Sequence, residues 1–212
     1  LALQPEPLYL VTVRGTGTVT MLEAVRLLRM VHPNPKRTIL VGHWSGEEQG
    51  LNGSRAFAAD HPEVVRGLQA LFNQDNGTGP IVAVSGSGLA SAEQVLGRWF
   101  GRLPASMTSR MRYQFPGRPA TGGSDHAAFA CYGAPAFGLS SAPWDYGSYT
   151  WHTNLDTYDK VVPEFVRGNA TMVAMLAYLA SEDPETFPRG GAEGVTFGEC
   201  TRPARAWREF TR

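Results

Sequence analysis

Residues 38–54 read Thr38-Ile-Leu-Val-Gly-His-Trp-Ser-Gly-Glu-Glu-Gln-Gly-Leu-Asn-Gly-Ser54, and the pattern changes sharply after Trp44. The first part, residues 38–44, is apolar and β-branched, which predicts a buried strand. The second part places two adjacent carboxylates, Glu47 and Glu48, between glycines that allow tight backbone turns. One carboxylate could bind a metal ion while its neighbour accepts a proton from water. The alternative for such a pair is an ordinary solvated acidic loop.

Two further residues of types that commonly bind metal ions lie at the ends of segments whose sequence predicts ordered structure. Asp75 comes directly after residues 68–74, a segment with the apolar centre Ala70-Leu-Phe72 that predicts a second buried strand. His152 precedes a polar turn that contains Asp156. Each has a simpler interpretation, because Asp75 could merely start a turn and His152 could be a loop histidine bonded to Asp156. If all these groups are functional, strand ends are where an α/β sheet would gather them.

The rest of the chain alternates helical and strand patterns, as in an α/β layer fold. Helical periodicity and a capping-box pattern predict a helix that begins near Thr20 and ends before Pro33. Further helices are predicted at residues 53–60, with a break at Pro62, and at 90–100, 125–132 and 164–181. Further strands are predicted at residues 81–85, 111–115 and 135–139.

Taken in order, these motifs resemble the co-catalytic zinc exopeptidases of metallopeptidase family 28. The motifs are Glu47-Glu48, Asp75, Ser124-Asp125-His126, His152 and Asp156-Thr157. The resemblance covers residues 16–183 and is closest to the branch of plasma glutamate carboxypeptidase and bacterial aminopeptidases. It implies a three-layer αβα fold with a mostly parallel mixed central sheet. We expect one peptidase-like domain over residues 1–212, with an atypical lead-in at 1–14 and a C-terminal extension at 184–212.

The resemblance also implies roles for individual residues. Glu47 matches the family's general base, and Glu48 and His152 match two ligands that share one zinc ion. Asp75 matches a ligand of a second zinc ion. A further group is expected to orient ligands or shape the substrate pocket: Ser124, Asp125, His126 and Tyr149. Two of them have alternatives, because His126 could be a helix-start or core histidine and Tyr149 could simply stiffen its loop. Tyr146 and Trp151, beside Tyr149 in the sequence, could likewise line a substrate pocket near His152 or stiffen the loop.

One departure from the family pattern bears on activity. The family carries a His-x-Asp motif and then a bridging aspartate before a Gly-Thr-Gly helix start. Here Gly15-Thr-Gly17 is present, but Val13-Arg14 precedes it, and no histidine occurs before His32. Because catalytic zinc generally needs three protein ligands, we expect weak zinc binding and little peptidase activity. Arg14 would also place a cation near the metal position. An N-terminally incomplete or mis-joined chain would explain the departure, and so would a relative that has lost its metal.

The resemblance implies hydrolysis of a peptide or dipeptide by metal-activated water, with Glu47 as the proton acceptor. Two alternatives remain open. One is a non-catalytic, receptor-like or scaffold relative, which the missing ligands favour. The other is a glutaminyl-cyclase-like acyltransferase, which Gln49-Gly50 after the acid pair makes less favourable. Aminopeptidase and carboxypeptidase activity cannot be separated by any local motif.

Composition narrows the classes of molecule that the chain is expected to bind. The chain has 212 residues, 42% hydrophobic residues and a formal net charge of zero, so a basic nucleic-acid-binding surface is not expected. No run approaches the roughly 18 apolar residues of a membrane span. No signal peptide is visible, although the resemblance suggests a secreted or periplasmic protein and leaves a homodimer open. Cys131 is expected to be an ordinary buried thiol, with a bridge to Cys200 as the alternative.

Overall fold

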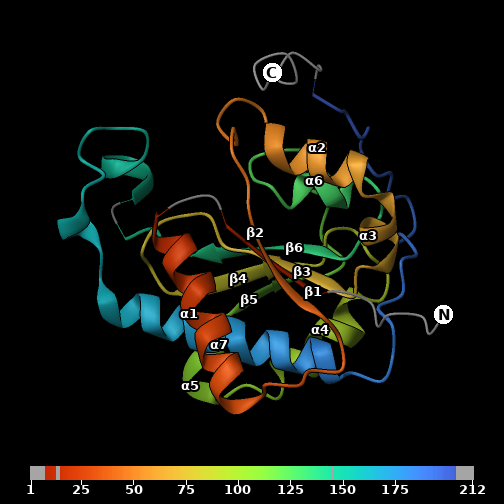
Figure 1. Ribbon diagram of the computed structural model, residues 1–212, viewed down its shortest axis with the longest axis horizontal. Helices are drawn as coiled ribbons and strands as arrows, with labels where there is room; N and C mark the ends of the chain where they lie inside the picture. The colour runs from red at the N-terminus through yellow and green to blue at the C-terminus, as the bar shows by residue number, and fades with distance from the viewer. Residues whose placement is uncertain (1–7, 13–14, 145, 204–212) are drawn as a thin grey trace.

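The computed structural model describes residues 8–12, 15–144 and 146–203 and centres on a six-stranded sheet (Figure 1). The strand order is β2-β1-β3-β6-β4-β5. Strands β2, β1, β3 and β6 are parallel, whereas β4 runs antiparallel to β6 and parallel to β5. The mostly parallel mixed sheet is therefore confirmed. The strands are β1 (Leu8–Thr12), β2 (Ile39–His43), β3 (Ala70–Asn73), β4 (Ile81–Ser85), β5 (Arg112–Gln114) and β6 (Ala136–Ser141).

Helices cover both faces of the sheet, which confirms the three-layer arrangement (Figure 1). One face carries α1 (Gly15–Val31), α4 (Ala92–Phe100), α5 (Ala105–Thr108) and α7 (Pro163–Glu182). The other face carries α2 (Asn52–Asp60), α3 (Pro62–Gly67) and α6 (Ala127–Ala130). Within the described part of the chain, every helix is too short or too polar to cross a bilayer.

Alternation along β3 builds a hydrophobic core on each side of the sheet. Ala70 and Phe72 belong to the cluster beneath α1, α4 and α7, whereas Leu71 belongs to the cluster beneath α2, α3 and α6. Successive strand side chains point to opposite faces, so a strand covered on both sides is apolar throughout. All three side chains are completely buried, and each large one contributes about 1.5–3 kcal/mol of transfer free energy.

The lead-in departs from expectation, because Leu8–Thr12 forms strand β1 in the interior of the sheet. It pairs in parallel with β2 and with β3, so that Val11 lies opposite both Gly42 and Asn73. The run Leu-Tyr-Leu-Val-Thr contains the aromatic and β-branched residues that are typical of a strand. Its pairing partners, β2 and β3, come from later in the chain, so its own sequence does not place it in the sheet. Residues 1–7 and 13–14, including Arg14, lie outside the described residues.

Strand β2 is less buried than its apolar sequence predicts. It lies at the edge of the sheet beside β1, and its side chains are intermediate or exposed. His43, at its end, is exposed, so the strand predicted at residues 38–44 is present but the prediction of its burial is wrong. The other boundaries lie within a few residues of the predictions, and the chain breaks at Pro62 as expected. Helix α6 is shorter than predicted, because Asp125 and His126 precede it.

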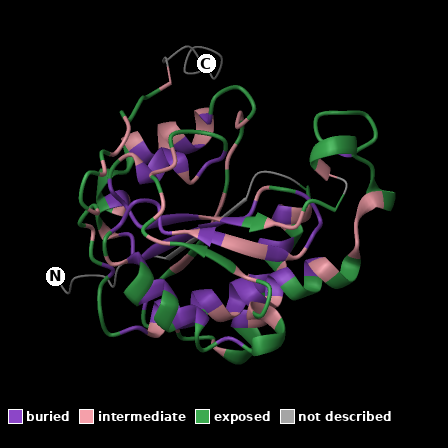
Figure 2. Ribbon diagram, turned by 180° about the vertical axis from the view of Figure 1, so that it is seen from behind, coloured by how far each residue is buried: buried purple, intermediate pink, exposed green. Residues whose placement is uncertain are grey.

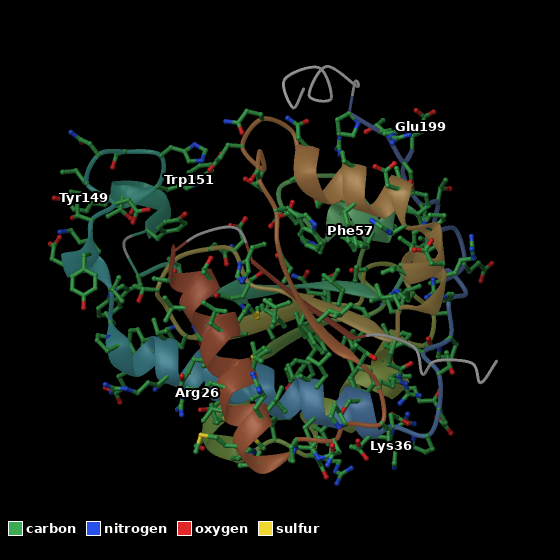
Figure 3. The ribbon with its side chains drawn as sticks, viewed as in Figure 1. Arg26, Lys36, Phe57, Tyr149, Trp151 and Glu199 are labelled. Atoms are coloured by element: carbon green, nitrogen blue, oxygen red, sulfur yellow. A yellow bond between two sulfur atoms is a disulfide. The ribbon has the colours of Figure 1, made fainter. Side chains whose placement is uncertain are left out.

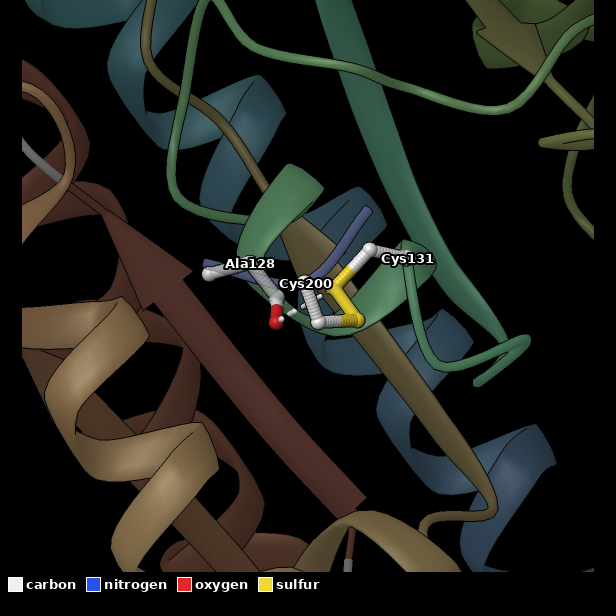
Figure 4. Close-up of a disulfide and its surroundings, with 3 residues drawn as sticks. All are labelled: Ala128, Cys131 and Cys200. Atoms are coloured by element: carbon white, nitrogen blue, oxygen red, sulfur yellow. Dashed lines mark hydrogen bonds between the residues drawn. A yellow bond between two sulfur atoms is a disulfide. The ribbon is translucent and has the colours of Figure 1, made fainter. Parts of the chain in front are cut away.

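The C-terminal extension packs back onto the domain. Phe187 is almost fully buried against Trp99 and Phe137, with ring centroids 5.8 Å and 5.3 Å away. Further along, Cys200 forms a disulfide with Cys131 at the end of α6, with their Cα atoms 5.3 Å apart (Figure 4). The expectation of an ordinary thiol at Cys131 is therefore wrong. Small and aromatic neighbours in the sequence indicate burial, but they carry no information about a chain segment that returns from 69 residues away.

Between β6 and α7 the chain forms a projecting segment, described at residues 144 and 146–160, which stands away from the sheet (Figure 2). Most of its described side chains are exposed, including large apolar ones. Five of them are more than two-fifths exposed: Trp144, Tyr149, Trp151, Leu155 and Tyr158. The segment carries His152, so its position decides whether that residue can reach the acid pair.

Candidate active site

The loop after β2 is fixed by its own backbone. The carbonyl of Glu47 accepts hydrogen bonds from the amides of Gly50 and Leu51 at 2.9 Å and 2.8 Å. The amide of Gly53 donates to Ser45 at 2.9 Å, and a Cβ atom on Gly53 would lie only 2.7 Å from that carbonyl oxygen. Leu51 takes a left-handed conformation with φ of 61°, which a leucine rarely adopts. The tight turn therefore has a specific geometry that presents the acid pair at the start of α2.

Glu47, Glu48, Asp75 and His152 all line one cavity of about 530 Å³. Nε2 of His152 lies 3.1 Å from Oε1 and 3.0 Å from Oε2 of Glu48. The three chain segments follow β2, β3 and β6, which are parallel, so their carboxyl ends share one edge of the sheet. The structure thus brings together residues that are up to 105 positions apart in the chain.

The contact between Glu48 and His152 lies at the mouth of the cavity. Both side chains are close to half exposed, at 46% and 49%, so the pair contributes little to stability. His152 has a φ of 58°, in the left-handed region, where histidine is found more often than most residues. Such a backbone persists where surrounding structure over-determines it, and it often marks a functional position.

Asp125 lies behind the cavity wall, close to Asp75. It is completely buried, and its Oδ1 accepts a hydrogen bond of 2.5 Å from the hydroxyl of Ser54. Among the described residues its second oxygen has no hydrogen-bond partner. Burial raises the pKa of Asp125 to about 6, the Ser54 bond opposes this, and the charge of Asp75 adds to it. Asp125 can therefore influence Asp75 without touching the cavity.

Ser124 and His126 contact the end of β3 rather than the cavity. The side-chain nitrogen Nδ2 of Asn73 donates to Oγ of Ser124 at 2.6 Å and lies 3.3 Å from Nδ1 of His126. The imidazole packs against Gly138 of β6, where a Cβ atom would lie 2.9 Å from Nε2. Burial lowers the pKa of His126 to about 4, so the ring is neutral near pH 7. Both residues hold the strand that precedes Asp75.

Tyr149 is placed differently from the expectation that it shapes the substrate pocket. It is 54% exposed, it is absent from the described cavity lining, and it lies on the outer side of the projecting segment (Figure 3). Tyr146 and Trp151 line the cavity instead. The ring of Tyr146 packs on Gly77, where a Cβ atom would lie 3.0 Å from its Cγ.

Arg55 is a cavity residue that the sequence analysis did not identify. It lines the cavity together with Leu51, one helical turn earlier, and with Gly122 and Gly123 on the opposite loop. Leu51 directly precedes α2, and the amide of Arg55 donates to its carbonyl at 2.9 Å, so the i, i+4 spacing places Arg55 in the first turn beside the acid loop; this is the signal that could have indicated it.

The helix-covered mixed sheet gathers two glutamates, an aspartate and a histidine at the carboxyl ends of its strands, where ligands bind in open α/β sheets. The sequence profile of peptidase family M28 matches residues 14–177. The chain belongs to peptidase family M28.

The relatives carry peptidase names. Leucine aminopeptidase 1 of Coccidioides posadasii is 28% identical over 174 residues, which cover 77% of this chain and 45% of that protein. Carboxypeptidase Q of Xenopus laevis is 25% identical over 178 residues, covering 82% of this chain and 36% of that protein. The chain thus spans less than half the length of these curated relatives. The crystal structure of a peptidase M28 precursor from Shewanella amazonensis has a TM-score of 0.67 at 22% identity, covering 88% of this chain and 44% of that one.

The available donors do not fit a two-zinc centre. Glu48 and His152 meet as two ligands of one metal would, and Asp75 lines the same cavity. However, the described residues contain no group of three histidine, cysteine, aspartate or glutamate side chains placed to hold one ion. Strand β1 lies between β2 and β3, and the next residues in the sequence, Val13 and Arg14, offer no carboxylate or imidazole.

Proposed function

We propose that this chain forms the peptide-binding cleft of a zinc-dependent exopeptidase, with Glu47 as the general base. Glu48 and His152 are the ligands of one metal position, and Asp75 is a ligand of the other. The single observation that carries the proposal is that these four side chains, from three strand ends, line one cavity. Its volume of about 530 Å³ is within the usual range for small-ligand sites and suits a dipeptide-sized molecule.

As written, the chain is proposed to hold zinc weakly and to hydrolyse peptides slowly. Each metal position lacks at least one of the three protein ligands that catalytic zinc usually has. After exhaustive dialysis against metal-free buffer, we expect elemental analysis to find well under one zinc ion per chain. Two tightly retained zinc ions per chain would contradict this proposal, because they would require donors that the described residues do not supply.

The role of Glu47 is tested by Glu47→Gln. Glutamine keeps the size of the side chain but cannot accept a proton from water, so any hydrolysis seen at saturating zinc should disappear. Zinc retention and peptide affinity should stay as in the parent chain. The exposed Glu63→Gln, on α3, is the matched control and should hydrolyse at the parent rate. Hydrolysis by Glu47→Gln at the parent rate would assign the base elsewhere.

A non-catalytic peptide-binding relative is the second candidate, and the absence of ligand-type residues at positions 13–14 favours it. One measurement distinguishes these two candidate functions. A peptide that binds but stays intact at saturating zinc supports the non-catalytic relative, whereas slow, zinc-dependent cleavage supports the peptidase. The disulfide supports an oxidising compartment for either candidate.

A further inference from the structure

Arg55 is a cation on the wall of the cavity, where the other charged side chains among the described residues are carboxylates. Glu47, Glu48 and Asp75 line the same cavity, and the imidazole there, His152, already contacts Glu48. Arg55 also borders a second cavity of about 190 Å³ beside Cys131. The Arg55 side chain therefore borders two open spaces.

The guanidinium of Arg55 makes no hydrogen bond or ion pair with any residue that the structure describes. A guanidinium has five donors in a planar fork, and nearby carboxylates would ordinarily engage them. Arg55 is therefore available to an acidic ligand that enters the cavity.

The wall beside Arg55 offers further donors. Gly122 and Gly123 line the cavity, and their amides donate to no acceptor among the described residues. Neither glycine has any atom within 4 Å of the position that a Cβ would take, so a ligand can approach the backbone closely. Successive glycine amides beside a guanidinium are a common way to bind an anionic oxygen pair.

We propose that Arg55 binds the α-carboxylate of a peptide, so that the cleft takes short peptides by their free C-terminal end. This inference rests on the proposed function of the cavity as a peptide site. Arg55 attracts the carboxylate to its own part of the cavity wall, and this fixes the orientation of the peptide. A free N-terminal ammonium has no corresponding reason to lie beside Arg55.

The experiment measures peptide binding by calorimetry, which needs no turnover. The probes are the dipeptide Ala-Phe, its C-terminal amide, and an acetylated aspartate amide that carries only a side-chain carboxylate. The parent chain should bind the dipeptide acid about ten- to a hundredfold more tightly than the amide, as expected for charge-assisted hydrogen bonds. Arg55→Gln should abolish this preference by weakening the acid alone, and Arg55→Lys should restore part of it.

Arg66→Gln is the matched control, because Arg66 is an exposed arginine on α3 outside the cavity lining. It removes the same charge and should leave the preference intact. Equal binding of acid and amide by the parent chain would overturn the role of Arg55 while leaving a peptide site in place. Failure of the parent chain to bind either would overturn this inference and the proposed function together. If the aspartate amide bound as tightly as the dipeptide acid, assignment to the α-carboxylate would be wrong.

Discussion

Removing the disulfide by Cys131→Ala with Cys200→Ala is expected to lower the free energy of unfolding by about 4 kcal/mol at most. The bridge closes a loop of 69 residues, and a cross-link of that length removes much conformational entropy from the unfolded chain. It also holds the C-terminal extension, which buries Phe187 and covers the end of α6 (Figure 4). Urea unfolding should show the loss as a lower midpoint, and the melting temperature should fall by roughly 10 °C.

The control for the disulfide is the parent chain in the presence of a thiol reductant. If the covalent link is responsible, the reduced parent and the double alanine variant should unfold at the same urea concentration. Protease cleavage after Arg189 or Arg202 should also increase in both, because the extension loses its anchor. An unchanged midpoint in the double variant would show that non-covalent contacts alone hold the extension.

The pH profile of stability should contain two large, opposed contributions, from Asp125 and His126. The pKa of Asp125 is raised to about 6 in the folded state, so its contribution falls as pH rises from about 4 to 6. The pKa of His126 is lowered to about 4, so its contribution rises as pH rises from about 4 to 6.5. Each shift corresponds to on the order of 3 kcal/mol, and the two nearly cancel in the parent chain.

Single substitutions should expose each contribution. Relative to the parent, Asp125→Asn should gain stability steadily between about pH 4 and pH 6, because the buried charge no longer forms. His126→Asn should instead lose stability relative to the parent over a similar range, because the benefit of deprotonation is gone. Urea unfolding at closely spaced pH values, with a chelator present to keep metal from Asp75, measures both.

Asp156→Asn is the control for these pH profiles, because Asp156 is an exposed carboxylate on the projecting segment. It removes one surface carboxylate and leaves both buried groups in place, so the pH ranges of the Asp125 and His126 contributions should stay as in the parent chain. If the Asp125→Asn profile ran parallel to the parent from pH 4 to 7, the buried carboxyl would not titrate in that range. The position of Asp125 behind Asp75 would then have no electrostatic consequence for stability.

The sequence by itself determined most of the architecture. Segments with an apolar centre, such as residues 68–74, predicted strands. Helical periodicity after Thr20 predicted α1, because both patterns report local geometry and burial. The order of Glu47-Glu48, Asp75 and His152 along the chain indicated peptidase family M28, and this order does not depend on any contact in the fold. Local patterns were sufficient because helices and strands have fixed periods, of about 3.6 and 2 residues.

Only the tertiary structure decided which groups meet. It placed β1 between β2 and β3, brought His152 to within 3.0 Å of Glu48, and paired Cys131 with Cys200. It also placed Arg55 on the cavity wall and Tyr149 outside it. These contacts join segments distant in the chain, and their formation depends on the packing of the whole sheet. A residue's neighbours in sequence fix its local backbone, whereas its neighbours across the fold fix its chemistry.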